Sequence, residues 1–208
     1  MMTVASEIAE NLLAIKAVKL QPKMPFTWAS GIKSPIYTDN RQTIGYPKVR
    51  QAIAKGLSEL INQHFPTVDI IGGVATAGIP HAAWVADVMV KPMIYVRSKP
   101  KDHGAGKQIE GLDVAGKAVV LIDDLISTGG SVLGAVEAVR AAGGTVLGVV
   151  AIFSYELAAA EINFASAQVP FYVVTNYSTL IEVAKKNGDI NAEELALLHR
   201  WRENPQAW

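Results

Sequence analysis

From residue 68 onward, the hydrophobic positions form short continuous runs that alternate with longer amphipathic segments. The apolar runs occupy positions 68–71, 93–96, 118–122, 146–153 and 171–174. Such runs are typical of strands that are buried on both faces of a sheet. Helix-compatible segments occupy positions 79–88, 131–142, 157–167 and 179–186. The alternation predicts an α/β fold with a parallel sheet flanked by helices, and ligands at the carboxyl ends of the strands.

The chain before residue 68 has a different pattern. Apolar residues recur at helical spacing over positions 4–15, and Pro47 stands where the first turn of a second helix is expected. Between these helices, segments 26–28 and 35–38 are rich in aromatic and β-branched residues. They predict a small antiparallel hairpin. At the other end of the chain, positions 192–202 indicate a last helix.

Composition limits the classes of function. The chain has 208 residues, a size at which one domain is expected, and its 19 Lys and Arg balance its 19 Asp and Glu. The neutral balance gives no reason to expect a nucleic acid or an anionic membrane as partner, so any anion site must be local. There is no cysteine, no export signal and no apolar stretch near the roughly 20 residues that span a bilayer. We therefore expect a soluble cytoplasmic protein.

The strongest chemical signal is the segment 119–131. A buried strand runs into Asp123 and Asp124, and a turn rich in glycine and hydroxyl groups then leads into a helix. Glycines let backbone N–H groups approach a phosphate, and the helix presents its positive end to the anion. The two carboxylates cannot bind phosphate, but they can accept hydrogen bonds from sugar hydroxyls or hold a hydrated magnesium ion. Together these features predict a sugar-phosphate site.

Each part of this segment alone has a plainer interpretation. Paired acids often cap a helix, and two glycines often make a turn. The whole string is far less easily explained in that way. It lacks the lysine of a Walker loop and the G-x-G-x-x-G of dinucleotide folds.

The segment resembles the phosphoribosyl pyrophosphate motif of type I phosphoribosyltransferases. The resemblance implies a core of that type, with Asp123 and Asp124 on the ribose and the following loop on the 5′-phosphate. The residues so implied are Asp123, Asp124, Leu125, Ile126, Ser127, Thr128, Gly129, Gly130 and Ser131.

A second signal is the long segment 98–116, which is rich in glycine and charge. Cations lie in or beside it at Arg97, Lys99, Lys101, His103 and Lys107. A solvated charged loop is one interpretation, and a lid that closes over a pyrophosphate is the other. The segment resembles the mobile catalytic loop of orotate phosphoribosyltransferases. That resemblance implies that Arg97, Lys101 and His103 contact pyrophosphate, partly across a dimer interface. Lys99 would replace a lysine that is Ser98 here.

The segment 26–41 is similar to the N-terminal hood of the same family. The resemblance implies an orotate site that includes Ser34 and Tyr37, and Arg41 is a candidate partner of the orotate carboxylate. Ser127 and Tyr155 complete the expected orotate contacts. The chain departs from the family pattern at three positions that are often basic, namely Ala29, Ala77 and Tyr155.

The remaining histidines give no further site. His64, His81 and His199 lack a cluster of possible ligands, and a structural or exposed role is expected for each.

The resemblance implies one domain over 1–208, with a hood mainly at 1–45, a core at about 46–187 and a C-terminal helix at about 191–204. The expected reaction moves ribose 5-phosphate from phosphoribosyl pyrophosphate to orotate, giving orotidine 5′-monophosphate. Mg²⁺ would be held mainly by the substrate, with water linking it to Asp123 or Asp124, and a homodimer is expected. Lys101, His103, Asp123 and Asp124 are the expected catalytic residues. The alternatives are another acceptor base or a non-catalytic regulator that binds the sugar pyrophosphate.

Overall fold

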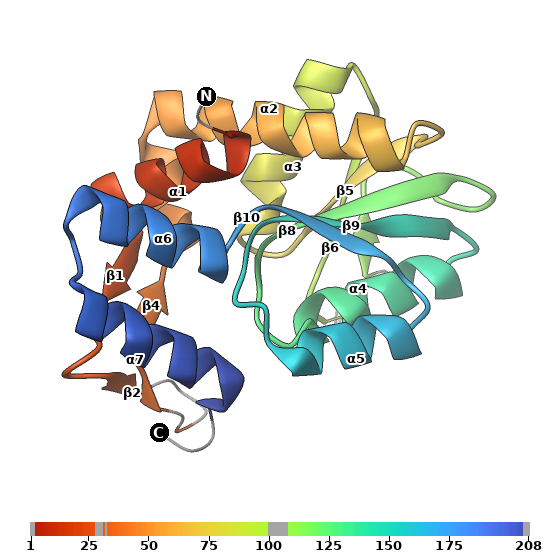
Figure 1. Ribbon diagram of the computed structural model, residues 1–208. Helices are drawn as coiled ribbons and strands as arrows, with labels where there is room; N and C mark the ends of the chain where they lie inside the picture. Colours follow the sequence, from red (N-terminus) through yellow and green to blue (C-terminus); the bar gives the residue numbers. More distant parts are fainter. Residues whose placement is uncertain (1–2, 28–30, 32, 100–107, 206–208) are drawn as a thin grey trace.

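A computed structural model describes residues 3–27, 31, 33–99 and 108–205 of the chain. Its centre is a six-stranded sheet in the order β10-β9-β8-β5-β6-β7, parallel except where β6 meets β7 (Figure 1). The strands are β5 Ile70–Val74, β6 Met93–Val96, β7 Ile109–Glu110, β8 Ala118–Ile126, β9 Thr145–Ser154 and β10 Phe171–Asn176. The apolar runs of the sequence form the parallel strands, so the predicted α/β sheet is confirmed.

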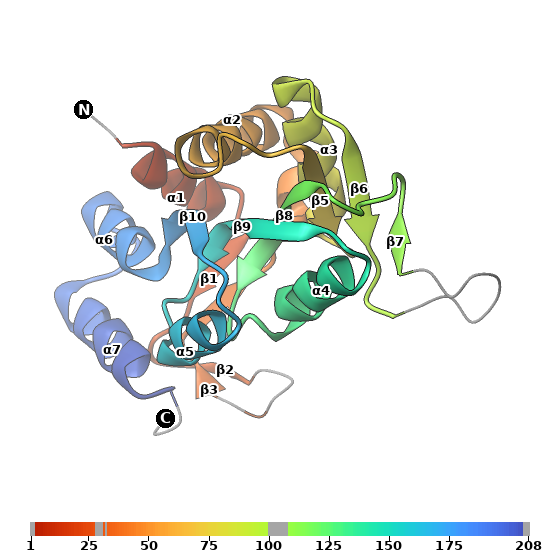
Figure 2. The same ribbon diagram turned by 90° about the vertical axis from the view of Figure 1, so that its right-hand side faces the viewer.

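Helices cover both faces of the sheet (Figures 1 and 2). On one face lie α1 Val4–Ala14, α2 Pro47–His64 and α3 Gly78–Met89, and on the other lie α4 Gly130–Ala141 and α5 Ala158–Ser166. Each face of the sheet packs against its own hydrophobic core, and successive side chains of β8 point into one core and then the other. Val120 and Ile122 face α1 to α3, while Val119 and Leu121 face α4 and α5. None of the helices in the described part of the chain is both long and apolar enough to cross a membrane.

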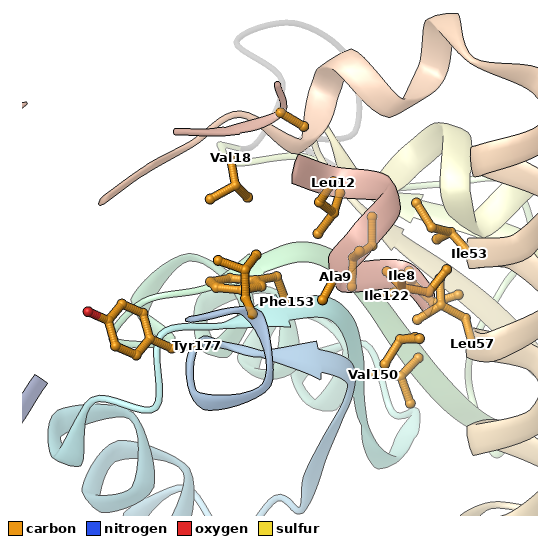
Figure 3. Packing of buried hydrophobic residues seen from close by; sticks show 14 of the residues in the cluster. Ile8, Ala9, Leu12, Val18, Ile53, Leu57, Ile122, Val150, Phe153 and Tyr177 are labelled. Atoms are coloured by element: carbon orange, nitrogen blue, oxygen red, sulfur yellow. The ribbon is translucent and has the colours of Figure 1, made fainter. Parts of the chain in front are cut away.

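Aliphatic side chains, with a few aromatic rings, fill the core beneath α1, α2 and α3 (Figure 3). Ile8 and Leu12 of α1 and Ile53 and Leu57 of α2 are fully buried there. Burying one such side chain stabilises the fold by roughly 1.5–3 kcal/mol. Each pair is spaced by one helical turn, which is the pattern that predicted these two helices.

The short strands of the N-terminal segment pair differently from the expected hairpin. β2 Phe26–Thr27 pairs with β3 Lys33–Ser34, whereas β4 Ile36–Thr38 pairs with β1 Val18–Leu20. The expected pairing of segments 26–28 and 35–38 is therefore wrong. Pro35 has no N–H to donate, and the Ser34 hydroxyl donates to the Ile36 carbonyl at 2.9 Å, so the chain turns between β3 and β4. A 3-10 helix, η1 Asn40–Gly45, then leads into α2.

The segment 98–116 is not a loop throughout. The pair of residues in β7 is antiparallel to the end of β6, with Tyr95 opposite Glu110 and Val96 opposite Ile109. Beyond this pair, the Arg97 N–H donates to the Gln108 carbonyl at 2.9 Å and the Gln108 side-chain amide donates to the Arg97 carbonyl at 2.8 Å. The two ends of the expected lid are thus joined by a short stem, which is too brief to show a period in the sequence.

Two helices at the C-terminal end, α6 Tyr177–Asn187 and α7 Ala192–Glu203, lie beside the short N-terminal strands (Figure 1). A capping box between Asn191 and Glu194 starts α7, and the last predicted helix is confirmed. The buried Trp201 indole N–H donates to the Lys33 carbonyl at 2.9 Å. This hydrogen bond ties the end of the chain to β3.

Candidate functional site

The carboxyl ends of β5 and β8 lie side by side in the middle of the sheet. The chain leaves β5 into α3 on one face and leaves β8 into α4 on the opposite face. In a parallel α/β sheet, ligands bind in the crevice where consecutive connections diverge in this way. The loop 75–77 and the loop 127–129 therefore border one candidate site.

The two borders of this crevice are in direct contact because α3 begins with a glycine. A Cβ atom at Gly78 would overlap the carbonyl oxygen of Ile122 and would lie 3.3 Å from the Cα of Asp123. Only glycine allows the helix to start this close to the strand. The position of α3 and the position of the first acid are therefore coupled.

The helices that begin at the crevice have no side-chain caps. Gly129 precedes α4 with a φ of 82°, Ala77 precedes α3, and neither position has a side-chain capping bond. The side chains of Thr3, Asn176 and Asn191 cap α1, α6 and α7, whereas α2 and α5 also start without a side-chain cap. Uncapped first-turn N–H groups and the positive end of the helix dipole attract anions. The crevice therefore has two positively polarised helix starts.

The loop after β8 presents hydroxyl and backbone groups at the surface. Thr128, Gly130 and Ser131 are exposed, and Ser127 is partly buried. Asn163 of α5 fixes the loop from behind by donating to the Thr128 carbonyl at 2.9 Å. Leu125 and Ile126 were also expected to bind phosphoribosyl pyrophosphate. The Ile126 side chain is fully buried and Leu125 packs against the core, so both would contribute through the backbone.

Asp123 and Asp124 lie within β8, at its carboxyl end. Burial, reinforced by the charge of Asp124, raises the pKa of Asp123 to about 7, and burial also raises the pKa of Asp124. Asp123 accepts a hydrogen bond from the Asp124 N–H at 2.9 Å. Two neighbouring carboxyls, one buried and one partly buried, are costly to ionise together. The pair is suited to receive hydroxyl donors or positive charge from a ligand.

The N-terminal segment reaches the acids through η1. Asn40 is buried, and its side-chain amide donates to the Asp124 carbonyl at 2.7 Å. Nearby, the Arg41 guanidinium donates to Asp39 at 2.6 Å, and this hydrogen bond holds the pKa of Asp39 below its usual value. The Arg41 side chain is 67% exposed. Sequence reasoning missed Asn40, because its partner lies 84 residues away and no local spacing indicates the bond.

The other residues expected at the orotate site differ in exposure. Tyr37 is 40% exposed and its ring lies near that of Phe26, whereas Ser34 is fully buried in the turn before Pro35. Tyr155 is 3% exposed, and burial raises its pKa to about 12. Its ring packs edge-on against Phe153. The structure thus places Tyr37 and Arg41 at the surface, with the Arg41 charge close enough to act on Asp124. Contacts of all four residues with a ligand stay predictions.

Part of the expected lid lies at the stem formed by β6 and β7. Arg97 is half-buried, and its guanidinium lies 3.9 Å from a carboxylate oxygen of Glu110. Lys99 is exposed. Lys101 and His103 lie outside the described residues, so their expected role stays a prediction.

Comparisons with known proteins identify the family of the chain. The family profile described as phosphoribosyl transferase domain matches residues 44–165, a range that contains the whole crevice. A relative from Lactiplantibacillus plantarum named orotate phosphoribosyltransferase is 60% identical over 208 residues, which cover 100% of this chain and 98% of that protein.

Solved structures show the same fold. The orotate phosphoribosyltransferase of Aeropyrum pernix matches with a TM-score of 0.74 and 29% identity, over 88% of this chain and 99% of that chain. The UMP synthase of Leishmania donovani matches with a TM-score of 0.82 and 28% identity, over 98% of this chain and 42% of the longer one.

Proposed function

The chain belongs to the orotate phosphoribosyltransferases, and from this premise we propose that its crevice transfers ribose 5-phosphate from 5-phosphoribosyl 1-pyrophosphate to orotate. The products are orotidine 5′-monophosphate and pyrophosphate, a step in the synthesis of pyrimidine nucleotides. One observation supports placing the reaction in the crevice between β5 and β8. The acids at the end of β8 lie directly before the uncapped start of α4, at the divergence of α3 and α4.

In the proposed reaction, the bond between C1 of ribose and a pyrophosphate oxygen breaks, and a ring nitrogen of orotate bonds to C1. The departing pyrophosphate keeps the electron pair of the broken bond, and C1 gains oxocarbenium character. The ring nitrogen loses its proton as it bonds to C1, and the departing pyrophosphate can take up that proton. The protein needs no nucleophile for this exchange. Its contribution is to position the two substrates and to stabilise the developing charge.

The sugar phosphate has a natural orientation in the crevice. The 5′-phosphate binds the loop Ser127 to Ser131 and the start of α4, and the ribose hydroxyls donate to Asp123 and Asp124. The pyrophosphate then points toward the start of α3. Arg97, Lys99, Lys101 and His103 would close over it from the lid, which excludes water from the activated sugar.

Mg²⁺ is the proposed cofactor. Mg²⁺ keeps several waters and takes one or two carboxylates beside substrate phosphates. Asp123 and Asp124 fit this requirement, and within the described ranges no group of three or more His, Cys, Asp or Glu could hold a metal. The donor set suits an ion that the substrate mainly holds and that Asp123 or Asp124 contacts through water. When bound, the ion neutralises the pyrophosphate leaving group.

The base has its proposed site under the hood, near Tyr37, Arg41 and Ser127. We expect Arg41→Ala to raise the KM for orotate about tenfold or more, because a charge-assisted pair with the orotate carboxylate is lost. The KM for phosphoribosyl pyrophosphate should change little. Steady-state kinetics with each substrate varied in turn measures both values. Lys55→Ala removes an exposed cation of α2 as the control, and an unchanged orotate KM in the Arg41 variant would exclude the assigned contact.

The function itself is tested by the loss of orotate absorbance when enzyme, phosphoribosyl pyrophosphate and Mg²⁺ are mixed. Uracil and adenine are run as competing acceptors, and a parallel reaction contains a chelator of Mg²⁺. We expect consumption of orotate alone, and none with the chelator. Pyrophosphate release with another base would replace the acceptor, and tight binding without turnover would favour a regulator.

We also propose that the chain acts as a homodimer in the cytoplasm. The exposed apolar side chains Val88, Val90 and Tyr95 support a second copy, since they lie at the end of α3 and on β6, beside the stem of the lid. In such a dimer, the lid of one copy serves the crevice of the other.

Mixing two inactive variants tests the shared lid. Lys101→Ala removes a lid cation and Asp123→Asn removes a ribose acceptor, so a mixed dimer regains one complete site. Random exchange of subunits should restore about a quarter of the wild-type activity, because half of the dimers are mixed and each has one working site of two. Absence of any regained activity, after subunit exchange has been verified, would contradict shared sites.

A further inference from the structure

Three buried polar side chains form a connection that ends on the backbone of Asp124. Asn40, Thr43 and His81 have exposed fractions of 1%, 0% and 0%. The Asn40 side-chain amide donates to the backbone carbonyl of Asp124 at 2.7 Å. The Thr43 hydroxyl donates to the backbone carbonyl of Asn40 at 2.6 Å. The Thr43 Oγ1 also lies 3.3 Å from His81 Nε2. The connection runs from α3 through η1 to the end of β8.

The number of protons fixes the direction of each hydrogen bond. A threonine hydroxyl has one proton, and Thr43 gives it to the Asn40 carbonyl. The contact with His81 therefore requires an N–H on Nε2 that donates to the Thr43 oxygen. His81 Nδ1 has no hydrogen-bond partner among the described residues, so Thr43 is the polar anchor of this ring. Burial lowers the pKa of His81 to about 4, which keeps the ring neutral near pH 7.

We propose that His81 is a positioning residue for the transfer reaction, and that it acts on Asp124 through Thr43 and Asn40. The proposal rests on the function proposed above. His81 lies one turn after Gly78 on α3, the helix that faces the pyrophosphate, whereas Asp124 faces the ribose. The connection is a second link between these two borders of the crevice, beside the contact of Gly78 with Ile122. A displacement of about 1 Å in such a site can lower a rate about a hundredfold, which is why a residue without substrate contact can matter.

Three variants separate this role from simple packing. His81→Leu fills the space without an N–H, His81→Gln keeps an amide N–H at a similar reach, and Thr43→Val removes the hydroxyl with little change in shape. We expect His81→Leu and Thr43→Val to lower kcat/KM for orotate between about tenfold and about a hundredfold. His81→Gln should recover most of that loss. Equal losses for leucine and glutamine, or wild-type kinetics for leucine, would overturn the proposal.

The double variant tests whether the two residues act as one unit. If His81 works through Thr43, combining His81→Leu with Thr43→Val should lower kcat/KM no further than the stronger single change. Multiplying losses would show independent effects and would overturn the proposal. Thr175→Val is the matched control, because this buried threonine on β10 has a hydroxyl without a hydrogen-bond partner in the described part of the chain. It should keep the wild-type kcat/KM.

The affinity for phosphoribosyl pyrophosphate can be measured whether or not orotate is the acceptor, so it tests the role of His81 separately from the proposed reaction. If the wild type does not consume orotate, the acceptor is wrong, and the connection is then tested by titration calorimetry with phosphoribosyl pyrophosphate and Mg²⁺. His81→Leu should weaken that binding about tenfold, and His81→Gln should weaken it less. Equal dissociation constants for the wild type and the leucine variant would overturn the role of His81.

Discussion

Asp123→Asn should lower kcat/KM by a factor of about 10²–10³ and at the same time stabilise the fold above neutral pH. The loss of activity is comparable to removal of one preorganised hydrogen-bond group from an active site. An amide has one acceptor oxygen where a carboxylate has two, and it has no negative charge to stabilise the positive charge that develops near C1. Steady-state kinetics at saturating Mg²⁺ measures this loss.

The expected gain in stability follows from the pKa of the buried acid. Burial raises the pKa of Asp123 from 3.8 to about 7, so the folded state holds this proton more tightly than the unfolded state. The stabilising contribution is complete below about pH 4 and is lost as the pH rises through about 7. Asparagine carries no such charge. The free energy of unfolding of the variant should therefore exceed that of the wild type at pH 8 by roughly 1–3 kcal/mol, and much less at pH 5.

Urea unfolding without ligand at both pH values measures this difference. Asp69→Asn is the matched control, because Asp69 is exposed and accepts from the Ala118 N–H at 2.8 Å, at the opposite end of β8. The control should keep both its activity and the wild-type dependence of stability on pH. If Asp123→Asn lost activity but followed the pH dependence of the wild type, the raised pKa would belong to another group.

Gly78→Ala should damage stability and catalysis together. Alanine is the better helix former, so propensity alone favours the variant. The new Cβ would however overlap the Ile122 carbonyl oxygen, and β8 cannot easily retreat because it is hydrogen-bonded to β5 and β9 on its two sides. Overpacking of this kind costs about 1–3 kcal/mol. The shift also moves Asp123, and we expect kcat/KM to fall at least about tenfold.

Gly134→Ala is the matched control for Gly78→Ala, and we expect it to raise the stability of the fold without lowering activity. Gly134 lies in α4, and apart from the adjacent helix backbone no described atom lies within 4 Å of a Cβ built there. This variant should be more stable than the wild type by about 0.5–1 kcal/mol and fully active. Thermal unfolding together with orotate consumption measures both effects. A Gly78→Ala variant that behaved like Gly134→Ala would contradict the close contact between α3 and β8.

The sheet and its helices were predictable because each has a strong local pattern. The long apolar runs of β8 and β9 are buried on both faces, and α1 and α2 repeat apolar residues at every turn. The strands β1 and β7 have three residues and two residues, which is too few for any period to show. The partner of β4 was also missed, because proximity in the sequence favoured the hairpin and the turn at Pro35 prevents it.

The part of the candidate site that lies in one continuous segment could be predicted from the sequence. The acids and the loop of residues 123–131 follow one another directly, so residue types alone indicated a sugar phosphate. The hydrogen bonds of Asn40 and His81 could not be predicted from the sequence, because their partners Asp124 and Thr43 lie 84 and 38 residues away. A histidine without possible metal ligands nearby looks inert in a sequence. Its hydrogen bond to a buried hydroxyl is visible only in the fold.

The hydrogen bond from Trp201 to Lys33 has a consequence for synthesis of the chain. It joins residues that are 168 positions apart, so β3 leaves the ribosome long before its supporting helix exists. The buried rings of Tyr177 and Trp201 lie 5.5 Å apart, and both come from the last part to be translated. During translation β3 therefore waits for α7 before this hydrogen bond can form.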